Sequence, residues 1–189
     1  MDNEHSHVYS NPHWKADDSY LTVQDYSGSI RIPVRALNIT WGNVARFWER
    51  IPLTEENTKL TGFEEAALLL QVNWIEVTGK LSILPSMALS TSTTYEILYI
   101  LKFREDAFGW HSAPVKFKLR INGEDKVKSE ILHCYREKQD EWHEIPGGQF
   151  TVSKDITVGM VEFGMFEVES DWWKGGLILA GIKIEPKLV

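Results

Sequence analysis

Residues 115–121 constrain the fold of this chain more than any other segment, because apolar and cationic side chains alternate strictly along them. Such a period of two is typical of a β-strand with one buried face and one solvated face. Asn122-Gly123 follows directly and is a strong signal for a tight hairpin turn. The apolar residues that share the buried face are Val115, Phe117, Leu119 and Ile121. The segment therefore predicts the first strand of an antiparallel hairpin.

Other segments also carry strand patterns. Residues 75–83 place Ile75, Val77, Leu81 and Ile83 on one face. Residues 94–104 are apolar on both faces, as in a strand at the middle of a packed structure. Further strands are expected at 160–168, at 177–184 and, as edge strands, at 20–23 and 30–34, where Pro33 cannot donate to a ladder.

One short α-helix is expected near residues 62–71. Thr61 and Glu64 have the spacing of a capping box, and residues 66–70 are good helix formers. Many short strands with a single helix indicate an all-β protein, a jelly-roll-like β-sandwich.

Length and composition suggest one domain in a reducing compartment. Of the 189 residues, we expect 1–19 to form a flexible polar leader and 20–189 a single domain. The formal net charge of −7 opposes binding to nucleic acid or to an anionic membrane and favours a neutral ligand. No signal peptide and no stretch of about 20 apolar residues is found, so a cytoplasmic or nuclear location is expected. The single cysteine, Cys134, excludes an intramolecular disulfide.

Tryptophan recurs through the chain in ordered motifs, and it is a residue that stacks well against flat ligands. The motifs, in order, are Leu37-Asn38-Ile39-Thr40-Trp41, Phe47-Trp48, Val72-Asn73-Trp74-Ile75-Glu76-Val77, Asp140-Glu141-Trp142-His143-Glu144-Ile145, Phe166-Glu167-Val168 and Trp172-Trp173-Lys174-Gly175-Gly176. From about residue 36 to residue 187, this order resembles the plant phloem lectin family, the phloem protein 2 or Nictaba-like domain.

The resemblance implies a phloem lectin that binds without catalysis and needs no cofactor. Its expected partners are N-acetylglucosamine oligomers, meaning chitooligosaccharides and the glycan cores of N-acetylglucosamine-containing glycoproteins. The family also implies a cytoplasmic protein of phloem sap and a homodimer, which would supply two sites and some avidity.

Trp41 and Trp48 are the first candidate binding residues. They flank a polar turn at Gly42-Asn43, so the two rings would form one platform for a sugar. The resemblance implicates both tryptophans in carbohydrate binding. The alternative is that both indoles belong to the core.

Glu167, Trp173 and Lys174 are the other candidates. Strand alternation places Glu167 on an apolar face, where its carboxylate needs a cation, a backbone amide or a ligand hydroxyl as partner. Trp173 and Lys174 match a Trp-Lys element of the family, and an extended backbone would let only one of Trp172 and Trp173 face a ligand. A member of the family has another acidic residue seven positions before the glutamate that matches Glu167, where this chain has Met160.

Several residues receive a different interpretation. Trp74 and Trp142 lie within strand patterns and are expected to fill the structure. Residues 130–135 read as a strand that buries Cys134 as an inert thiol, although an exposed thiol that forms an intermolecular bridge is the competing reading.

The sequence offers weaker signals for three other functions. A glycosidase would pair carboxylates among Glu162, Glu167 and Glu169, but alternation separates the first from the other two. No metal site is expected, because His111, His133 and His143 show no ligand spacing; His5, His7 and His13 of the leader could chelate a metal only adventitiously. RNA binding is the alternative function, carried by a basic strip that consists of Lys116, Lys118 and Arg120, joined by Lys126 and Lys128.

Overall fold

The computed structural model describes residues 11–20, 28–83, 92–152 and 159–187. Its strands are β1 Ile30–Pro33, β2 Asn38–Ile39, β3 Trp48–Pro52, β4 Glu65–Leu69, β5 Ile75–Ile83, β6 Thr94–Phe108, β7 Val115–Ile121, β8 Glu124–Glu130, β9 Trp142–Thr151, β10 Gly159–Glu167 and β11 Gly175–Pro186. Its helical segments are the 3₁₀ turns η1 Asp18–Tyr20 and η2 Val34–Ala36, and the α-helices α1 Glu55–Thr61 and α2 His133–Arg136.

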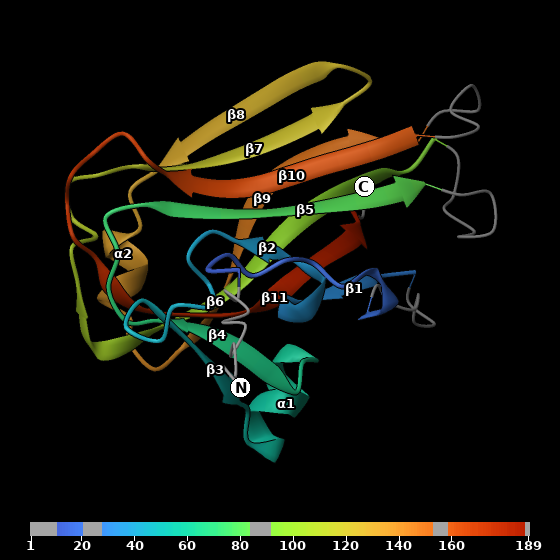
Figure 1. Ribbon diagram of the computed structural model, residues 1–189. Coiled ribbons are helices and arrows are strands. Elements are labelled where there is room, and N and C mark those ends of the chain that lie inside the picture. Colours follow the sequence, from blue (N-terminus) through green and yellow to red (C-terminus); the bar gives the residue numbers. More distant parts are fainter. Residues whose placement is uncertain (1–10, 21–27, 84–91, 153–158, 188–189) are drawn as a thin grey trace, which may run out of the picture.

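The strands form two antiparallel sheets that pack face to face (Figure 1). One sheet has the order β3-β4-β11-β6-β9, with β1 paired to β11. The other has the order β2-β5-β10-β7-β8. This arrangement confirms the all-β sandwich. No helix in the described part of the chain has the length and apolar character needed to span a membrane.

The core lies between the inner faces of the sheets, as the period of two requires. Along β5 the buried residues include Ile75, Val77, Leu81 and Ile83, the set expected from the sequence. Strand β10 contributes its own alternate residues from Val161 onward, and β7 contributes its apolar face. The β7–β8 hairpin turns at Asn122 and Gly123, whose φ angles of 52° and 77° suit the turn predicted there.

The helix lies elsewhere than expected. Helix α1 ends at Thr61, Thr54 caps its start through a bond from the Asn57 N–H, and Gly62 closes it with a φ of 82°. The residues that follow form β4, which pairs with β3 on one side and β11 on the other. A short apolar run fits a buried strand as well as a helix. Pairing on both sides therefore outweighed the helix propensity of Ala66–Leu70.

The segment before the domain is also more ordered than a flexible leader. Trp14 is 5% exposed and belongs to the main core cluster. It exchanges two backbone hydrogen bonds with Ile39, of 3.0 and 2.9 Å, and the Asn43 N–H donates to the Pro12 carbonyl. This polar segment contains one large apolar anchor, Trp14, which packs in the sandwich while residues 11, 12, 15 and 17 stay exposed. Residues 1–10 lie outside the described part of the chain. A strand was expected at 20–23. Tyr20 lies in η1 instead, and residues 21–23 are outside the described part of the chain.

The region of Cys134 differs from its expected conformation and burial. Strand β8 ends at Glu130, and Cys134 lies in the short helix α2 with its side chain exposed. Leu132, two residues earlier, is fully buried and provides the anchor of this segment to the core. A helical turn after such an anchor points the next residues to solvent, so the strand-based inference of a buried thiol was wrong.

Because its thiol is exposed, Cys134 should react with a maleimide in the native protein as fast as in the unfolded chain, and one label per chain should appear by mass spectrometry. Cys134→Ser is the control and should take no label. Slow labelling that accelerates only in denaturant would contradict the exposed position.

Candidate ligand-binding site

One end of the sandwich gathers the loops that carry most of the exposed tryptophans. In the five-stranded sheet, Ile75 at the start of β5 pairs with Glu167 at the end of β10, and Ile39 at the end of β2 pairs with Val77. The loops 40–47, 70–74 and 168–174 therefore leave the sandwich at the same end, on the left in Figure 1. We call this end the indole end.

Four indoles are exposed to solvent on these loops. Trp41 is 38% exposed, Trp74 41%, and Trp172 and Trp173 are 49% each. Large apolar side chains gathered at the surface mark interaction sites more often than isolated ones do. The indole end is therefore the strongest candidate for a ligand-binding surface among the described residues.

Glu76 connects Trp74 to the backbone that carries Trp41. The Trp74 Nε1–H donates to Glu76 Oε2 at 3.0 Å, and the Thr40 hydroxyl donates to the same oxygen at 3.3 Å. The Thr40 N–H also donates to the Glu76 carbonyl, at 3.0 Å. Among the described residues the other carboxylate oxygen of Glu76 has no protein partner, so it remains an acceptor beside an exposed indole.

Trp41 is held in an uncommon backbone conformation, with a φ of +63°. For a residue other than glycine this left-handed region costs about 1–2 kcal/mol. Its N–H donates to His13 Nδ1 at 3.0 Å, and its ring contacts the rings of His13 and Phe47 at centroid distances of 4.7 and 6.4 Å. These contacts fix the indole at the surface before any ligand arrives.

Trp48 does not join Trp41 at the surface. It begins β3, is 3% exposed and packs in the main core cluster. Its Nε1–H has no hydrogen-bond partner among the described residues. Of the charged neighbours that suggested exposure, Glu49 points to the opposite face of β3, whereas Arg50 shares the face of Trp48 and extends over the Trp14 ring to the surface. The structure therefore builds no two-ring platform across the Gly42-Asn43 turn.

Glu167 and Lys174 form a buried ion pair behind the indole end. Lys174 is 0% exposed and Glu167 4%, and the Lys174 Nζ lies 2.5 Å from Glu167 Oε2. Lys174 Nζ also donates to the Trp172 carbonyl at 2.7 Å, and Glu167 Oε1 accepts from the Ser170 N–H at 3.2 Å. Glu167 thus has the cationic partner that its apolar face required. The pair closes loop 168–174 from inside, so it positions the indoles and lies away from solvent.

Both tryptophans of this loop are exposed, and the extended backbone from which only one was expected to face a ligand is not formed here. Residues 171–173 are not part of a strand, so the alternation of an extended backbone does not apply to them. Lys174 then forms a β-bridge with Val72, two residues before Trp74. That bridge brings the backbone of Trp173 next to the loop that carries Trp74.

Sequence reasoning missed Trp74 and Glu76, although the signal was present. Because Ile75 and Val77 point into the core, Trp74 and Glu76 must point to the opposite face. Trp142 does fill structure: it is half-buried, packs on the smaller core cluster and donates to Asn57 Oδ1 at 3.1 Å. Met160 lies at the start of β10, the strand that ends at Glu167, so it is remote from the indole end.

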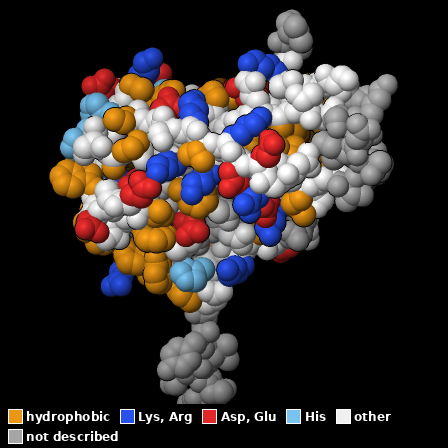
Figure 2. All heavy atoms as spheres, turned by 90° about the horizontal axis from the view of Figure 1, so that it is seen from above, with side chains coloured by type: hydrophobic (Ala, Val, Ile, Leu, Met, Phe, Trp, Pro, Cys, Tyr) orange, Lys and Arg blue, Asp and Glu red, His pale blue; other side chains and the backbone are white. Residues whose placement is uncertain are grey.

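The basic strip considered for RNA is divided between two faces. Residues paired across antiparallel strands share a face. Lys126 and Lys128 pair with Leu119 and Phe117, so they lie opposite the cations of β7. Those cations are engaged: Lys116 pairs with Glu169 at 2.5 Å, Arg120 pairs with Asp125 at 2.8 Å, and Lys118 lies over the Phe166 ring. Figure 2, which views the molecule from the side of β7 and β8, shows basic and acidic side chains interleaved.

Removing one member of the buried pair should destabilise the protein, because the partner charge would stay buried alone. Glu167→Gln and Lys174→Met should each lower the free energy of unfolding by about 3–5 kcal/mol, and the double variant should recover part of the loss. Urea unfolding measures this. Glu162→Gln, which removes an exposed pair with Lys80, is the control and should change stability by less than about 1 kcal/mol. Equal stability of Glu167→Gln and the parent would contradict the positioning role.

Several plant proteins are similar in sequence to this chain. The chain is 38% identical over 124 residues to phloem protein 2-like A2 of Arabidopsis thaliana, covering 65% of this chain and 61% of the relative. It is 34% identical over 157 residues to phloem protein 2-like A5 of the same plant, covering 82% of this chain and 36% of the relative. A lectin of Luffa acutangula is 29% identical over 161 residues, covering 85% of this chain and 72% of the relative. The chain thus spans less than two thirds of the length of the two Arabidopsis relatives.

The family comparison agrees with the order of motifs in the sequence and with the observed sandwich. The family model described as Phloem protein 2 matches residues 28–186, which include every strand of the two sheets. The chain belongs to the phloem protein 2 family.

Proposed function

We propose that this protein is a lectin that binds N-acetylglucosamine oligomers at the indole end and does not transform them. The observation that carries the proposal is the presence of four exposed indoles on loops at one end of the sandwich, where the Glu76 carboxylate accepts from Trp74 and a buried ion pair closes loop 168–174. The Luffa acutangula relative, described as a lectin, supports carbohydrate as the ligand class.

The chemistry of the indole end matches a sugar that carries an acetamido group. A pyranose presents a face of C–H bonds that stacks on an indole, and its hydroxyls seek carboxylates and amides. In N-acetylglucosamine the acetamide N–H can donate to the free oxygen of Glu76, while its methyl group packs against Trp74. A linear oligomer would continue over the neighbouring exposed rings.

The roles of the candidate residues follow from their positions. In this proposal Trp41, Trp74 and Trp173 stack on sugar rings, and Glu76 accepts hydrogen bonds from the ligand. Glu167 and Lys174 position the loop from below, and Trp48 supports β3 from the core. Affinity would therefore depend on Glu167 through the geometry of the loop.

The placement of the carboxylates supports binding without catalysis. Glu167 is paired with Lys174 inside the fold. On the outside, Glu162 Oε1 lies 3.7 Å from Lys80 Nζ, and Glu169 Oε1 lies 2.5 Å from Lys116 Nζ. Lys116 lowers the pKa of Glu169, which keeps that carboxyl ionised and unsuited to act as a general acid near neutral pH. These three glutamates do not converge on one point.

The first test removes the exposed rings one at a time. Trp41→Ala, Trp74→Ala and Trp173→Ala should each weaken binding of chitotriose by about 5- to 150-fold, the equivalent of about 1–3 kcal/mol for loss of one stacking ring. Isothermal titration calorimetry measures the affinity. Leu60→Ala, which removes an exposed apolar side chain on α1, is the control and should bind normally. Parent-like affinity in all three tryptophan variants would place the ligand elsewhere.

The second test separates a lectin from the RNA-binding alternative by salt. Binding of neutral chitotriose should change little between low and high ionic strength, because no phosphate counterions are released. Chitotriose affinity that collapses with salt, or RNA binding that chitotriose does not displace, would refute the assignment.

Glu76→Gln should weaken chitotriose binding, since an amide is a poorer acceptor than a carboxylate.

A further inference from the structure

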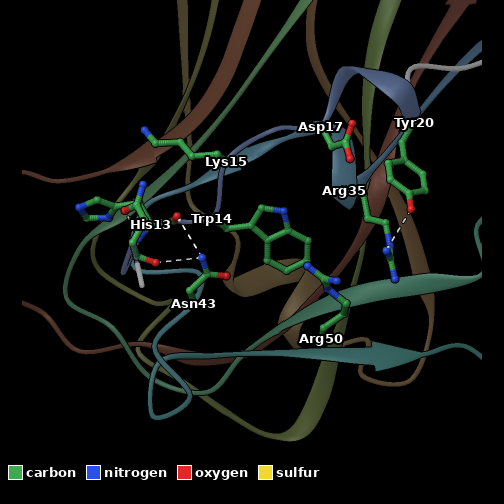
Figure 3. Close-up of a pocket in the computed structure, with 9 residues that line it drawn as sticks. His13, Trp14, Lys15, Asp17, Tyr20, Arg35, Asn43 and Arg50 are labelled. Carbon is green, nitrogen blue, oxygen red and sulfur yellow. Dashed lines mark hydrogen bonds between the residues drawn. The ribbon is translucent and has the colours of Figure 1, made fainter. Parts of the chain in front are cut away.

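A polar pocket of about 400 Å³ lies beside Trp41, apart from the residues assigned to chitooligomers (Figure 3). It is lined by Asn11, His13, Trp14, Lys15, Asp17, Tyr20, Arg35, Asn43 and Arg50. Most of these residues precede position 28, where the match to the phloem protein 2 family begins. The pocket is thus built by joining a segment outside that match to side chains from within it.

Trp14 organises the pocket. Its backbone pairs with Ile39, and its indole lies across the middle of the pocket with Lys15 on one side and Asp17 on the other (Figure 3). The Arg50 guanidinium lies over this ring, with Cζ 3.9 Å from the ring centroid. The aromatic floor and one cation are therefore held in place before a ligand binds.

The cations of the pocket are not all neutralised. Arg35 is fully engaged, donating to both oxygens of Glu65 at 2.6 and 3.0 Å and to the Tyr20 hydroxyl. Arg50 shares that same carboxylate only at 3.8 Å and makes no hydrogen bond among the described residues. Lys15 likewise has no hydrogen-bond or ion-pair partner among the described residues. A chain with a net charge of −7 thus keeps two cations available in one pocket.

Acceptors accompany these donors. The Asp17 carboxylate accepts from the N–H and hydroxyl of Ser19 at 3.0 and 2.6 Å, which lowers its pKa and keeps it ionised. The Asn43 side-chain NH₂ donates to the carbonyls of Asn11 and His13, both at 3.1 Å, so its Oδ1 remains an acceptor. A bare inorganic anion such as sulfate has no N–H or O–H group to donate to these acceptors. The pocket therefore suits a ligand that carries hydroxyl groups beside its negative charge.

We propose that this pocket binds a sugar that carries a carboxylate, such as a hexuronic acid unit. The carboxylate pairs with Arg50, the Lys15 ammonium adds a second positive charge on the other side of Trp14, and the hydroxyls donate to Asp17 and to Asn43 Oδ1. The sugar ring lies by the Trp14–Arg50 stack. The ligand class differs from neutral N-acetylglucosamine oligomers, and the pocket does not depend on their binding at the indole end.

The test compares D-galacturonate with D-galactose, which differ only in the carboxylate at C6. Calorimetry should show that galacturonate binds and that galactose binds at least about tenfold more weakly. Lys15→Gln and Arg50→Gln should each weaken galacturonate binding by about tenfold and leave galactose unchanged. Lys126→Gln, an exposed lysine on β8, is the matched control. Indole NMR signals should place the galacturonate-induced shift at Trp14.

Each outcome bears on the proposal. Equal affinity for the two sugars, or unchanged galacturonate affinity in Lys15→Gln, would overturn it, and the exposed Lys15 leaves no reason for that variant to misfold. Sulfate that binds as tightly as galacturonate and depends on the same two cations would reduce the pocket to a general anion site and also overturn it. Chitotriose titrated into Lys15→Gln tests the indole end separately, since its affinity should equal that of the parent.

Discussion

The ion pair between Lys174 and Glu167 joins the two layers of the sandwich at the end where the exposed tryptophans gather. Glu167 closes β10 in one sheet, and Lys174 stands directly before β11 in the other. The chain therefore passes from layer to layer through a loop that is held by one buried charge pair. Two charges without water are costly unless their bonds are satisfied, and the Trp172 carbonyl and Ser170 N–H satisfy them here.

Period-two patterns carried most of the fold prediction. Strands β5, β7 and β10 bury the residues that alternation selects, and the Asn122-Gly123 turn lies where it was expected. Residues 65–69 were misassigned because a short apolar run has no period that separates a helix from a strand. Their strand state depends on pairing with β3, which lies beyond α1, and with β11, which is distant along the chain, and a local pattern shows neither partner.

The candidate site was harder to predict than the fold, for physical reasons that differ between residues. Trp48 was misleading because charged neighbours on a strand say nothing about the face of the residue between them. Trp74 was assigned to the interior even though the alternation of its own strand points it outward. Glu167 was correctly expected to need a partner, but the identity of that partner depends on the path of loop 168–174, which no spacing rule describes.

Residues 11–17 are attached to the sandwich through β2, and they form no strand of either sheet. The two sheets bury their core through strands that begin at Ile30, and the earlier segment contributes one anchor, Trp14, and a row of polar side chains. Substitutions of these polar side chains would alter the surface beside Trp41 without disturbing the hydrogen bonds between strands of either sheet. A change in this short peptide would therefore alter the shape and charge of the pocket beside Trp41 and leave the two sheets intact.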